Sequence, residues 1–132
     1  MRCRVYSEKL RTAYTWEILY TDEYAGWFLG LTDAEQVDVQ AMVDVLEIKG
    51  PNLGRPQADT IKGSKKVKNL KELVIQLAGK PYRFFYAFDP KRRAVLLCGG
   101  RKDGSKDKQF YKQMVPLAEA EFADHLKSEG LK

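Results

Sequence analysis

Arg83, Arg101 and Tyr111 are the side chains whose types and spacing best suit chemistry on a phosphate. Arg83 stands within an alternating aromatic run, Arg101 ends the apolar run that follows, and Tyr111 lies near the start of the last helical pattern. When a ribose 2′-OH attacks its own phosphate, cations stabilise the developing charge, and a tyrosine can move a proton if neighbouring cations lower its pKa from about 10. The same residues also fit the ordinary rim of a sheet, so both interpretations stay open.

The common catalytic and cofactor patterns are missing from the sequence. His125 is the one histidine, which excludes a pair of histidines acting as acid and base, and we expect it at the surface or at a helix end. The sequence has no Cys/His cluster, HExxH motif, phosphate-binding loop or dinucleotide-binding glycine motif. Cys3 and Cys98 are too few for a disulfide framework. We therefore expect no metal and no cofactor.

Positive charge is concentrated in the second half of the chain. The 132 residues carry a net charge of +5, but residues 50–112 hold 16 Lys/Arg against five Asp/Glu, a net +11, and the remainder holds seven against 13, a net −6. Such a distribution favours a polyanion surface, because cations that neutralise phosphates release counterions. The lysines that we expect to bind RNA, if they are not merely solvated, are Lys65, Lys66, Lys68, Lys71 and Lys102.

The first half of the chain predicts one strand and two helices. Residues 16–20 are rich in strand-forming types, and Thr21 is a suitable N-cap for a short helix that runs to about Gly30. Thr32-Asp-Ala-Glu35 has the pattern of a capping box, which predicts a second helix up to Gly50-Pro51. We expect the core side of this second helix to carry the apolar residues at helical spacing, Val37, Ala41, Val45 and Ile48, with Met42 and Leu46 beside them.

The second half of the chain predicts a loop over 52–69, with a brief strand near Ile61. Three strands follow, over 70–77, 82–89 and 94–100. After a loop over 102–106 we expect a helix over 107–128, which restarts or bends at Pro116. In the middle strand Tyr82 and Phe84 alternate onto the core side, whereas Arg83 and Phe85 face the other way. The order predicts an α+β fold: an N-terminal strand, a helical hairpin, an antiparallel β-meander and a C-terminal helix, with the helices on one sheet face.

One domain over 15–132, preceded by an N-terminal arm over 1–14 without an assigned role, accounts for the length. The longest uncharged stretch, from Tyr24 to Thr32, falls far short of the ~20 apolar residues of a membrane span. The N-terminus lacks the apolar core of a secretory signal. We expect a cytoplasmic protein with no membrane partner.

Three segments, taken together, resemble a known family. They are Asn69-Leu-Lys-Glu-Leu73, Gly79-Lys-Pro-Tyr-Arg-Phe-Phe-Tyr-Ala-Phe-Asp-Pro90 and Arg93-Ala-Val-Leu-Leu-Cys-Gly-Gly100. The joined pattern of strand, glycine turn, Tyr-Arg strand and Asp-Pro turn is similar to the central meander of RelE/ParE-superfamily toxins, and most similar to their HigB-like branch. The resemblance extends from about Trp16 to Leu126.

The resemblance implies a RelE-like fold and the toxin component of a type II toxin–antitoxin system. Members of that family are ribosome-dependent, metal-independent mRNA endoribonucleases or, in the ParE branch, non-enzymatic poisons of DNA gyrase. By this resemblance Arg83 would stabilise the scissile phosphate, Arg101 or Lys102 would match a second basic residue, and Tyr111 would match an aromatic one. The implied partners are the ribosome, mRNA and a cognate antitoxin, whose acidic or amphipathic segment would cover the basic sheet face.

The sequence departs from the family pattern at two positions. The residues five and seven places before the turn glycine are basic in RelE, and here they are Val74 and Glu72. Lys68 is a freer substitute than Lys71, which strand parity places on the side of Leu73. Three functions stay open: an mRNA endoribonuclease, a gyrase poison, and a basic nucleic-acid-binding domain without toxicity. The nuclease hypothesis requires that the Arg83 guanidinium be open to a phosphodiester.

Overall fold

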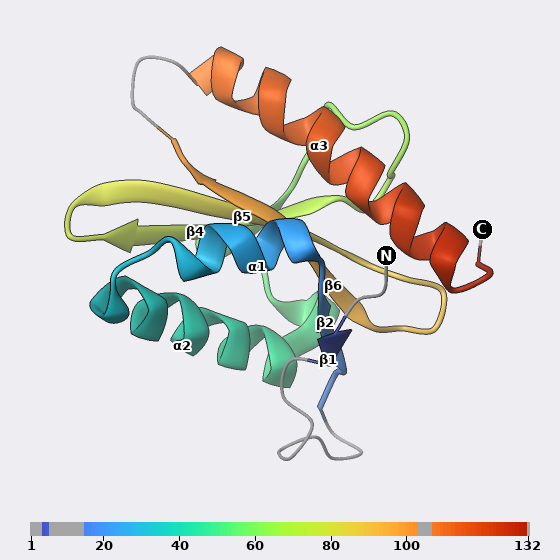
Figure 1. The fold of residues 1–132 in the computed structure, drawn as a ribbon, viewed down its shortest axis with the longest axis horizontal. Helices are drawn as coiled ribbons and strands as arrows, with labels where there is room; N and C mark the ends of the chain where they lie inside the picture. The colour runs from blue at the N-terminus through green and yellow to red at the C-terminus, as the bar shows by residue number, and fades with distance from the viewer. Residues whose placement is uncertain (1–3, 6–14, 103–106, 132) are drawn as a thin grey trace.

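The computed structural model describes residues 4–5, 15–102 and 107–131, which fold around one six-stranded sheet in the order β1-β2-β6-β5-β4-β3 (Figure 1). Neighbours β3 to β6 pair antiparallel, whereas β2 lies parallel to β6. The predicted α+β order of elements is confirmed. The strands are β1 (Arg4–Val5), β2 (Ile18–Tyr20), β3 (Ala58–Thr60), β4 (Lys71–Leu77), β5 (Lys80–Phe88) and β6 (Ala94–Arg101).

The helices begin where the sequence places their caps. Thr21 caps α1 (Asp22–Leu29) by accepting from the Tyr24 amide, and Thr32 forms the predicted capping box with Glu35 at the start of α2 (Asp33–Lys49). A single turn, η1 (Gly50–Asn52), follows α2. The last helix, α3 (Asp107–Ser128), continues through Pro116 instead of restarting there. None of the helices in the described ranges is both long and apolar enough to cross a membrane.

Helices cover both faces of the sheet, which corrects the expectation that they share one face. Consecutive residues of a strand point to opposite faces, and Phe84 and Phe85 are both fully buried. Phe84 packs in a core with residues of α1 and α2, whereas Phe85 packs in a second core with Ala118 and Phe122 of α3. Figure 1 shows α3 above the strands and α2 below them. Arg83, on the Phe85 side, therefore lies under a helix-covered face.

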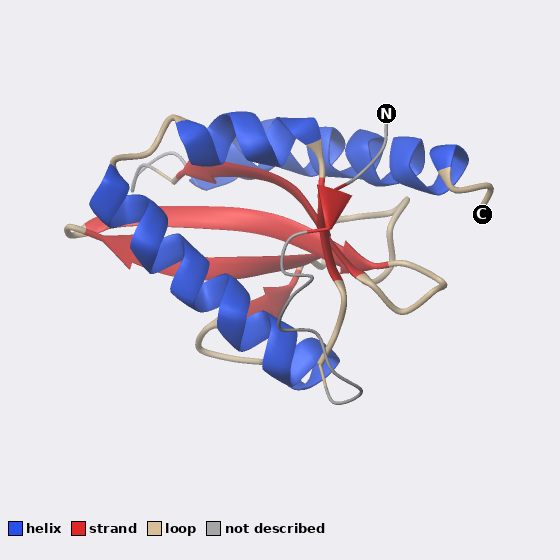
Figure 2. Cartoon of the chain, turned by 60° about the horizontal axis from the view of Figure 1, so that its bottom comes forward, coloured by secondary structure: helices blue, strands red, loops and turns tan. Residues whose placement is uncertain are grey.

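The α2 helix turns a different side to the core from the one predicted. Its buried apolar residues are Val39, Val43 and Leu46, whereas Val37 and Ile48 are 68% and 67% exposed. Two apolar stripes run along this helix, and spacing alone does not say which of them meets the sheet. Figure 2 shows α2 crossing the sheet obliquely.

Of the predicted arm over 1–14, only residues 4 and 5 are described, and they form an unpredicted strand that pairs antiparallel with β2. The boundary between arm and domain stays a prediction. The loop predicted over 102–106 falls, after Lys102, outside the described residues. The brief strand expected near Ile61 is β3, whose centre lies two residues before Ile61.

His125 lies in the last turn of α3, which agrees with the expected helix end, but it is buried, with 1% of its surface exposed, which corrects the alternative expectation of a place at the surface. Its Nε2 lies 2.8 Å from Oδ2 of Asp89, and the Arg93 Nε donates to the same oxygen at 2.9 Å. Arg93 also pairs with Glu129 at 2.7 Å. Asp89 directly follows β5 and His125 lies near the end of α3, so this network connects the helix to the β5–β6 hairpin. Burial of Asp89 would raise its pKa, but the hydrogen bonds from His125 and Arg93 outweigh burial and lower the pKa to about 2.

Candidate functional site

Glu72, Arg83 and Tyr111 meet at one point between the sheet and the first turns of α3. Glu72 on β4 pairs with Phe85, and Val74 pairs with Arg83, so Glu72 and Arg83 project from neighbouring strands onto the α3 face. The Tyr111 hydroxyl donates to Oε1 of Glu72 at 2.6 Å, and Nε of Arg83 lies 3.5 Å from the same oxygen. The carboxylate thus sits between a phenol and a guanidinium.

Arg83 does not meet the requirement that its guanidinium be open to a phosphodiester, which excludes a nuclease mechanism in which Arg83 itself contacts the scissile phosphate. Its side chain is 11% exposed, it pairs with Glu72, and its Nη1 donates to the Tyr82 carbonyl at 2.9 Å. Opposite Arg83 on β6 stands Gly100, where an added Cβ would lie 3.2 Å from Phe110 of α3. The missing side chain lets α3 approach closely and close over the arginine.

Tyr111 does not have the lowered pKa that a proton carrier would need. Burial raises its pKa most, and the hydrogen bond and negative charge of Glu72 raise it further, outweighing the opposing effect of Arg83. The phenol therefore stays protonated at neutral pH. Its geometry suits a fixed hydrogen-bond donor that holds the Glu72 carboxylate in place.

A groove of about 790 Å³, called here the α3 groove, runs between α3 and the loop over residues 60–66, with Glu72 and Tyr111 in its wall. Asp107 and Glu119 are its other acidic residues. Cations outnumber them, because the groove is also lined by Lys62, Lys65, Lys66, Lys108 and Lys112. The arrangement combines a carboxylate with several ammonium groups, which suits binding of a phosphodiester next to a proton acceptor.

Glu119 of α3 anchors the loop that forms the opposite wall of the α3 groove. Its Oε2 accepts from the Ser64 hydroxyl at 2.8 Å and from the Lys66 amide at 3.4 Å. The Ser64 hydroxyl in turn accepts from the Val67 amide at 3.2 Å. These bonds hold a loop rich in lysine against the helix, so its positive charge has a defined position beside Glu72 and Tyr111.

Arg101 and Lys102 differ in their position relative to the α3 groove. Arg101 stands across from Tyr82, whose side chain packs in the core of α1 and α2, so Arg101 points away from the α3 groove. Lys102 pairs with Asp107 at 3.4 Å, and its Nζ lies 5.7 Å from the centre of the Tyr111 ring. Of these two predicted cations, the structure brings only Lys102 to Tyr111.

The four predicted loop and strand lysines divide between two grooves. Lys65 and Lys66 line the α3 groove. Lys68 and Lys71 line a second groove of about 700 Å³, called here the Trp16 groove after its aromatic residue, and Lys66 lines both. The sequence therefore indicated a basic region, but it did not indicate that the lysines of this region line two separate grooves.

Glu72 is the functional candidate that sequence reasoning missed. In the sequence Glu72 stands out only as an acidic residue where the RelE pattern has a basic one. The available signal was strand parity, which puts Glu72 and Arg83 on the same sheet face once β4 and β5 are paired. Lys62, Lys108 and Lys112 were also missed, because only folding brings the loop over 60–66 against α3. Within the described ranges, no group of three or more His, Cys, Asp or Glu side chains is placed to hold a metal ion.

Fold and site together define a small α+β domain that carries a lysine-lined groove around a tethered carboxylate. The chain belongs to the phage-derived Gp49-like protein family (DUF891), whose model matches residues 26–123. The matched range contains all of α2, the meander and most of α3. It therefore includes Glu72, Arg83 and Tyr111.

Two similar proteins come from Mycobacterium tuberculosis (strain ATCC 25618 / H37Rv). A protein named "Putative toxin HigB3" is 40% identical over 103 residues, which are 78% of this chain and 87% of that protein. A protein named "Putative toxin HigB2" is 39% identical over 106 residues, 80% of this chain but only 52% of that longer protein. The names agree with the HigB-like resemblance of the meander.

Proposed function

We propose that this protein is the toxin component of a type II toxin–antitoxin system and acts as a metal-independent mRNA endoribonuclease on the ribosome. Relatives that carry HigB toxin names, at 40% and 39% identity, support the first part. The observation that carries the chemistry is the Glu72 carboxylate, which Tyr111 holds at 2.6 Å. Its side chain is only 12% exposed, but unlike Arg83 it lines the lysine-rich α3 groove. Membership in the wider RelE/ParE superfamily is part of the same proposal.

In the proposed reaction Glu72 is the general base. Its carboxylate accepts the proton of the ribose 2′-OH, the 2′ oxygen bonds to phosphorus, and the bond to the 5′ oxygen breaks, leaving a 2′,3′-cyclic phosphate. Groove lysines stabilise the extra negative charge of the phosphorane, and the ammonium group of Lys108 or Lys112 gives a proton to the departing 5′ oxygen. The ribosome supplies the orientation of the message.

Arg83 and Tyr111 are positioning residues in this scheme, because both act through Glu72. Arg83 pairs with the Glu72 carboxylate at 3.5 Å, and the Tyr111 hydroxyl fixes the direction of that carboxylate with a hydrogen bond of 2.6 Å. This role replaces the direct contact with phosphate that the family resemblance implied for Arg83. Lys102, stacked near Tyr111, extends the cationic rim of the site.

A cognate antitoxin is the second proposed partner, and a cytoplasmic location follows from action on ribosomes. An acidic segment would neutralise the α3 groove by pairing with its lysines. Such a segment would compete with RNA for the same cations, which explains how a binding partner blocks activity.

The test incubates the protein with translating ribosomes and maps cuts in the message by primer extension. Wild-type protein should cut the message, and replacing Lys108 and Lys112 together by Ala should lower the rate at least ten-fold. The matched control is Lys127→Ala, an exposed lysine of α3 outside both grooves. Uncut message with folded wild-type protein would refute the nuclease proposal.

The buried state of Arg83 favours one alternative, a non-enzymatic poison of DNA gyrase that uses the α3 groove only for binding. A binding surface needs no arginine open to a phosphate, and the Arg83 side chain is only 11% exposed. Expression of such a poison would produce gyrase-linked DNA breaks before protein synthesis falls. Arrest of translation without DNA breaks would eliminate it. The remaining hypothesis, a basic binding domain without toxicity, predicts normal growth on expression.

A further inference from the structure

The Trp16 groove combines aromatic side chains with cations and has no role in the site described above. We propose that it binds single-stranded RNA next to the α3 groove, with the Arg92 guanidinium, which lies over Trp16, as the plane that receives a base. This inference rests on the proposed function to the extent that RNA is the ligand. The side chains that carry it are Trp16, Lys66, Lys68, Lys71, Phe88 and Arg92.

Trp16 is held rigidly at the back of this groove. Its amide donates to the Glu47 carbonyl at 2.8 Å. Its indole packs edge to face with the Phe88 ring, and the two ring centres lie 5.4 Å apart. Gly50 lies directly against the indole, where an added Cβ would overlap the ring, and its φ of 54° also favours glycine. The absence of a side chain at Gly50 leaves room for the Trp16 indole, which is therefore held in a fixed position.

Arg92 covers this support from the β5–β6 turn. Its guanidinium carbon lies 5.0 Å from the centre of the Trp16 ring. The φ of Arg92 is 64°, a value that residues with a side chain rarely adopt. Its amide donates to the Asp89 carbonyl at 2.8 Å. The turn therefore fixes the position of the Arg92 backbone, from which the side chain extends over Trp16. Arg92 is exposed. An exposed guanidinium that lies over an aromatic ring is of the kind on which unpaired RNA bases stack.

The charges of the Trp16 groove suit the phosphates of the same strand. Lys66, Lys68 and Lys71 line it, and its acidic residue, Asp89, has a side chain that is 0% exposed and bonded to Arg93. The groove therefore presents cations without an accessible carboxylate. Single-stranded nucleic acids are bound in this way, by a basic path with stacking side chains.

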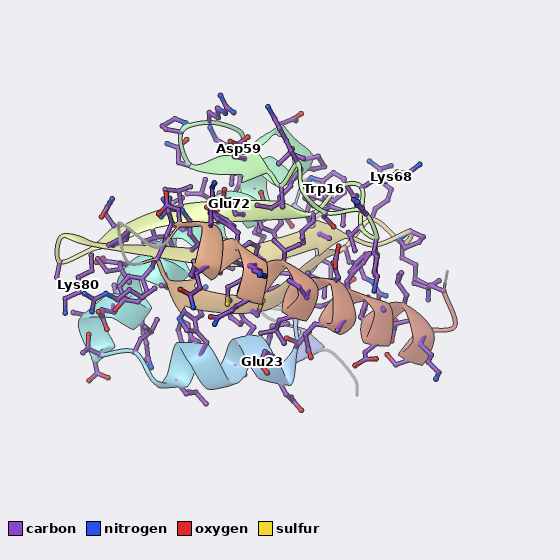
Figure 3. All side chains as sticks on the ribbon, turned by 90° about the horizontal axis from the view of Figure 1, so that it is seen from above. Trp16, Glu23, Asp59, Lys68, Glu72 and Lys80 are labelled. Carbon is purple, nitrogen blue, oxygen red and sulfur yellow. The ribbon has the colours of Figure 1, made fainter. Side chains whose placement is uncertain are left out.

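Lys66 lines both grooves, so a strand bound in one is led into the other. Figure 3 shows Glu72 and Lys68 on the same side of α3, with Glu23 on the other side. Along α3, Tyr111 beside Glu72 lies in the wall of the α3 groove, and Leu126 lies in the wall of the Trp16 groove. This distance along the helix is about 22 Å, the length of about six nucleotides at a stacked spacing of ~3.4 Å. The strand is either message that flanks the cut or exposed ribosomal RNA.

The test compares Arg92→Ala and Arg92→Lys with wild type and with Lys91→Ala, the neighbouring exposed lysine outside the groove. Binding of a fluorescent ten-nucleotide RNA, 2′-O-methylated so that it cannot be cut, is measured by anisotropy, and binding to vacant ribosomes by sedimentation. Circular dichroism confirms that each variant is folded. Arg92→Ala should weaken binding five-fold or more, Arg92→Lys should restore only part of the loss because it keeps charge without the plane, and Lys91→Ala should have no such effect.

A loss with the free oligonucleotide identifies the message as the source, and a loss with vacant ribosomes alone identifies ribosomal RNA. Equal binding of wild type and Arg92→Ala to both probes would overturn the proposal. These results are independent of cleavage. If wild type binds RNA through Arg92 but cuts nothing, the nuclease proposal fails and the groove stands; if wild type cuts and Arg92→Ala binds like wild type, only the groove fails.

Discussion

Replacement of Glu72 by Gln removes one negative charge from the centre of the site while preserving its shape. The Gln oxygen still accepts the hydrogen bond that Tyr111 donates at 2.6 Å. What is lost is the counter-charge of Arg83, 3.5 Å away, and the group that we propose to take the 2′-OH proton. The variant therefore separates catalysis from architecture better than Ala would.

The expected cost in stability follows from the burial of the pair. The side chains of Arg83 and Glu72 are 11% and 12% exposed, so the guanidinium loses its partner in a mostly dry place. Removing one member of a buried ion pair costs about 3–5 kcal/mol. The long distance and the remaining contact with water place this pair at the lower end, so we expect the free energy of unfolding to fall by about 3 kcal/mol. Urea unfolding followed by circular dichroism measures the change.

At a temperature where Glu72→Gln is folded, its lower stability does not affect the cleavage rate, so a fall in the rate reports the loss of the carboxylate. Loss of a general base slows a reaction about 10²–10⁴-fold, which corresponds to about 3–5 kcal/mol in activation free energy. Affinity for uncleavable RNA should rise instead, because the α3 groove gains one net positive charge. A rate that falls while affinity rises is the signature of a base, and a lost binding contact does not produce it.

The assay uses translating ribosomes, with Asp38→Asn on the exposed side of α2 as the matched control. Asp38→Asn removes the same charge far from the groove and should cut at the wild-type rate. If folded Glu72→Gln cuts within three-fold of wild type, Glu72 is not the base and the reasoning from its geometry is refuted.

Three further outcomes are expected. Tyr111→Phe should keep cleavage within about ten-fold of wild type in the ribosome assay, because the raised pKa of Tyr111 makes it a holder of Glu72 and not a proton carrier; a thousand-fold loss would contradict this. The pKa of Asp89 is about 2 in the folded protein against 3.8 for the free side chain, which should add about 2 kcal/mol to the free energy of unfolding. This contribution is present above pH 4 and is lost as pH falls toward 2, which urea unfolding at each pH measures. Asp89→Asn should show a flatter pH profile of stability, and a profile identical to that of wild type would exclude the network as the cause. Gly99→Ala should lower the free energy of unfolding by about 1–3 kcal/mol, because a Cβ at Gly99 would overlap the Trp27 indole, and an unchanged melting temperature would show that the indole moves away freely.

The sequence alone determined the elements of this protein, because their signals are local. The caps at Thr21 and Thr32 set where two helices begin, and the alternation around Phe84 set the faces of β5. The family resemblance also lies in such contiguous segments, which explains why it was visible without a structure. Local patterns likewise placed the basic charge in the second half of the chain, although they did not say which cations would share a groove.

The tertiary structure decided which faces are covered and therefore what the site is. Both stripes of α2 are apolar, so only packing selected Val43 over Val37 for the core. α3 lies on the face that the sequence left open, and this buries Arg83 and turns it from a contact for phosphate into a partner of Glu72. Side chains that are remote in sequence acquire their chemistry from burial and neighbouring charge, and those quantities exist only after the chain has packed.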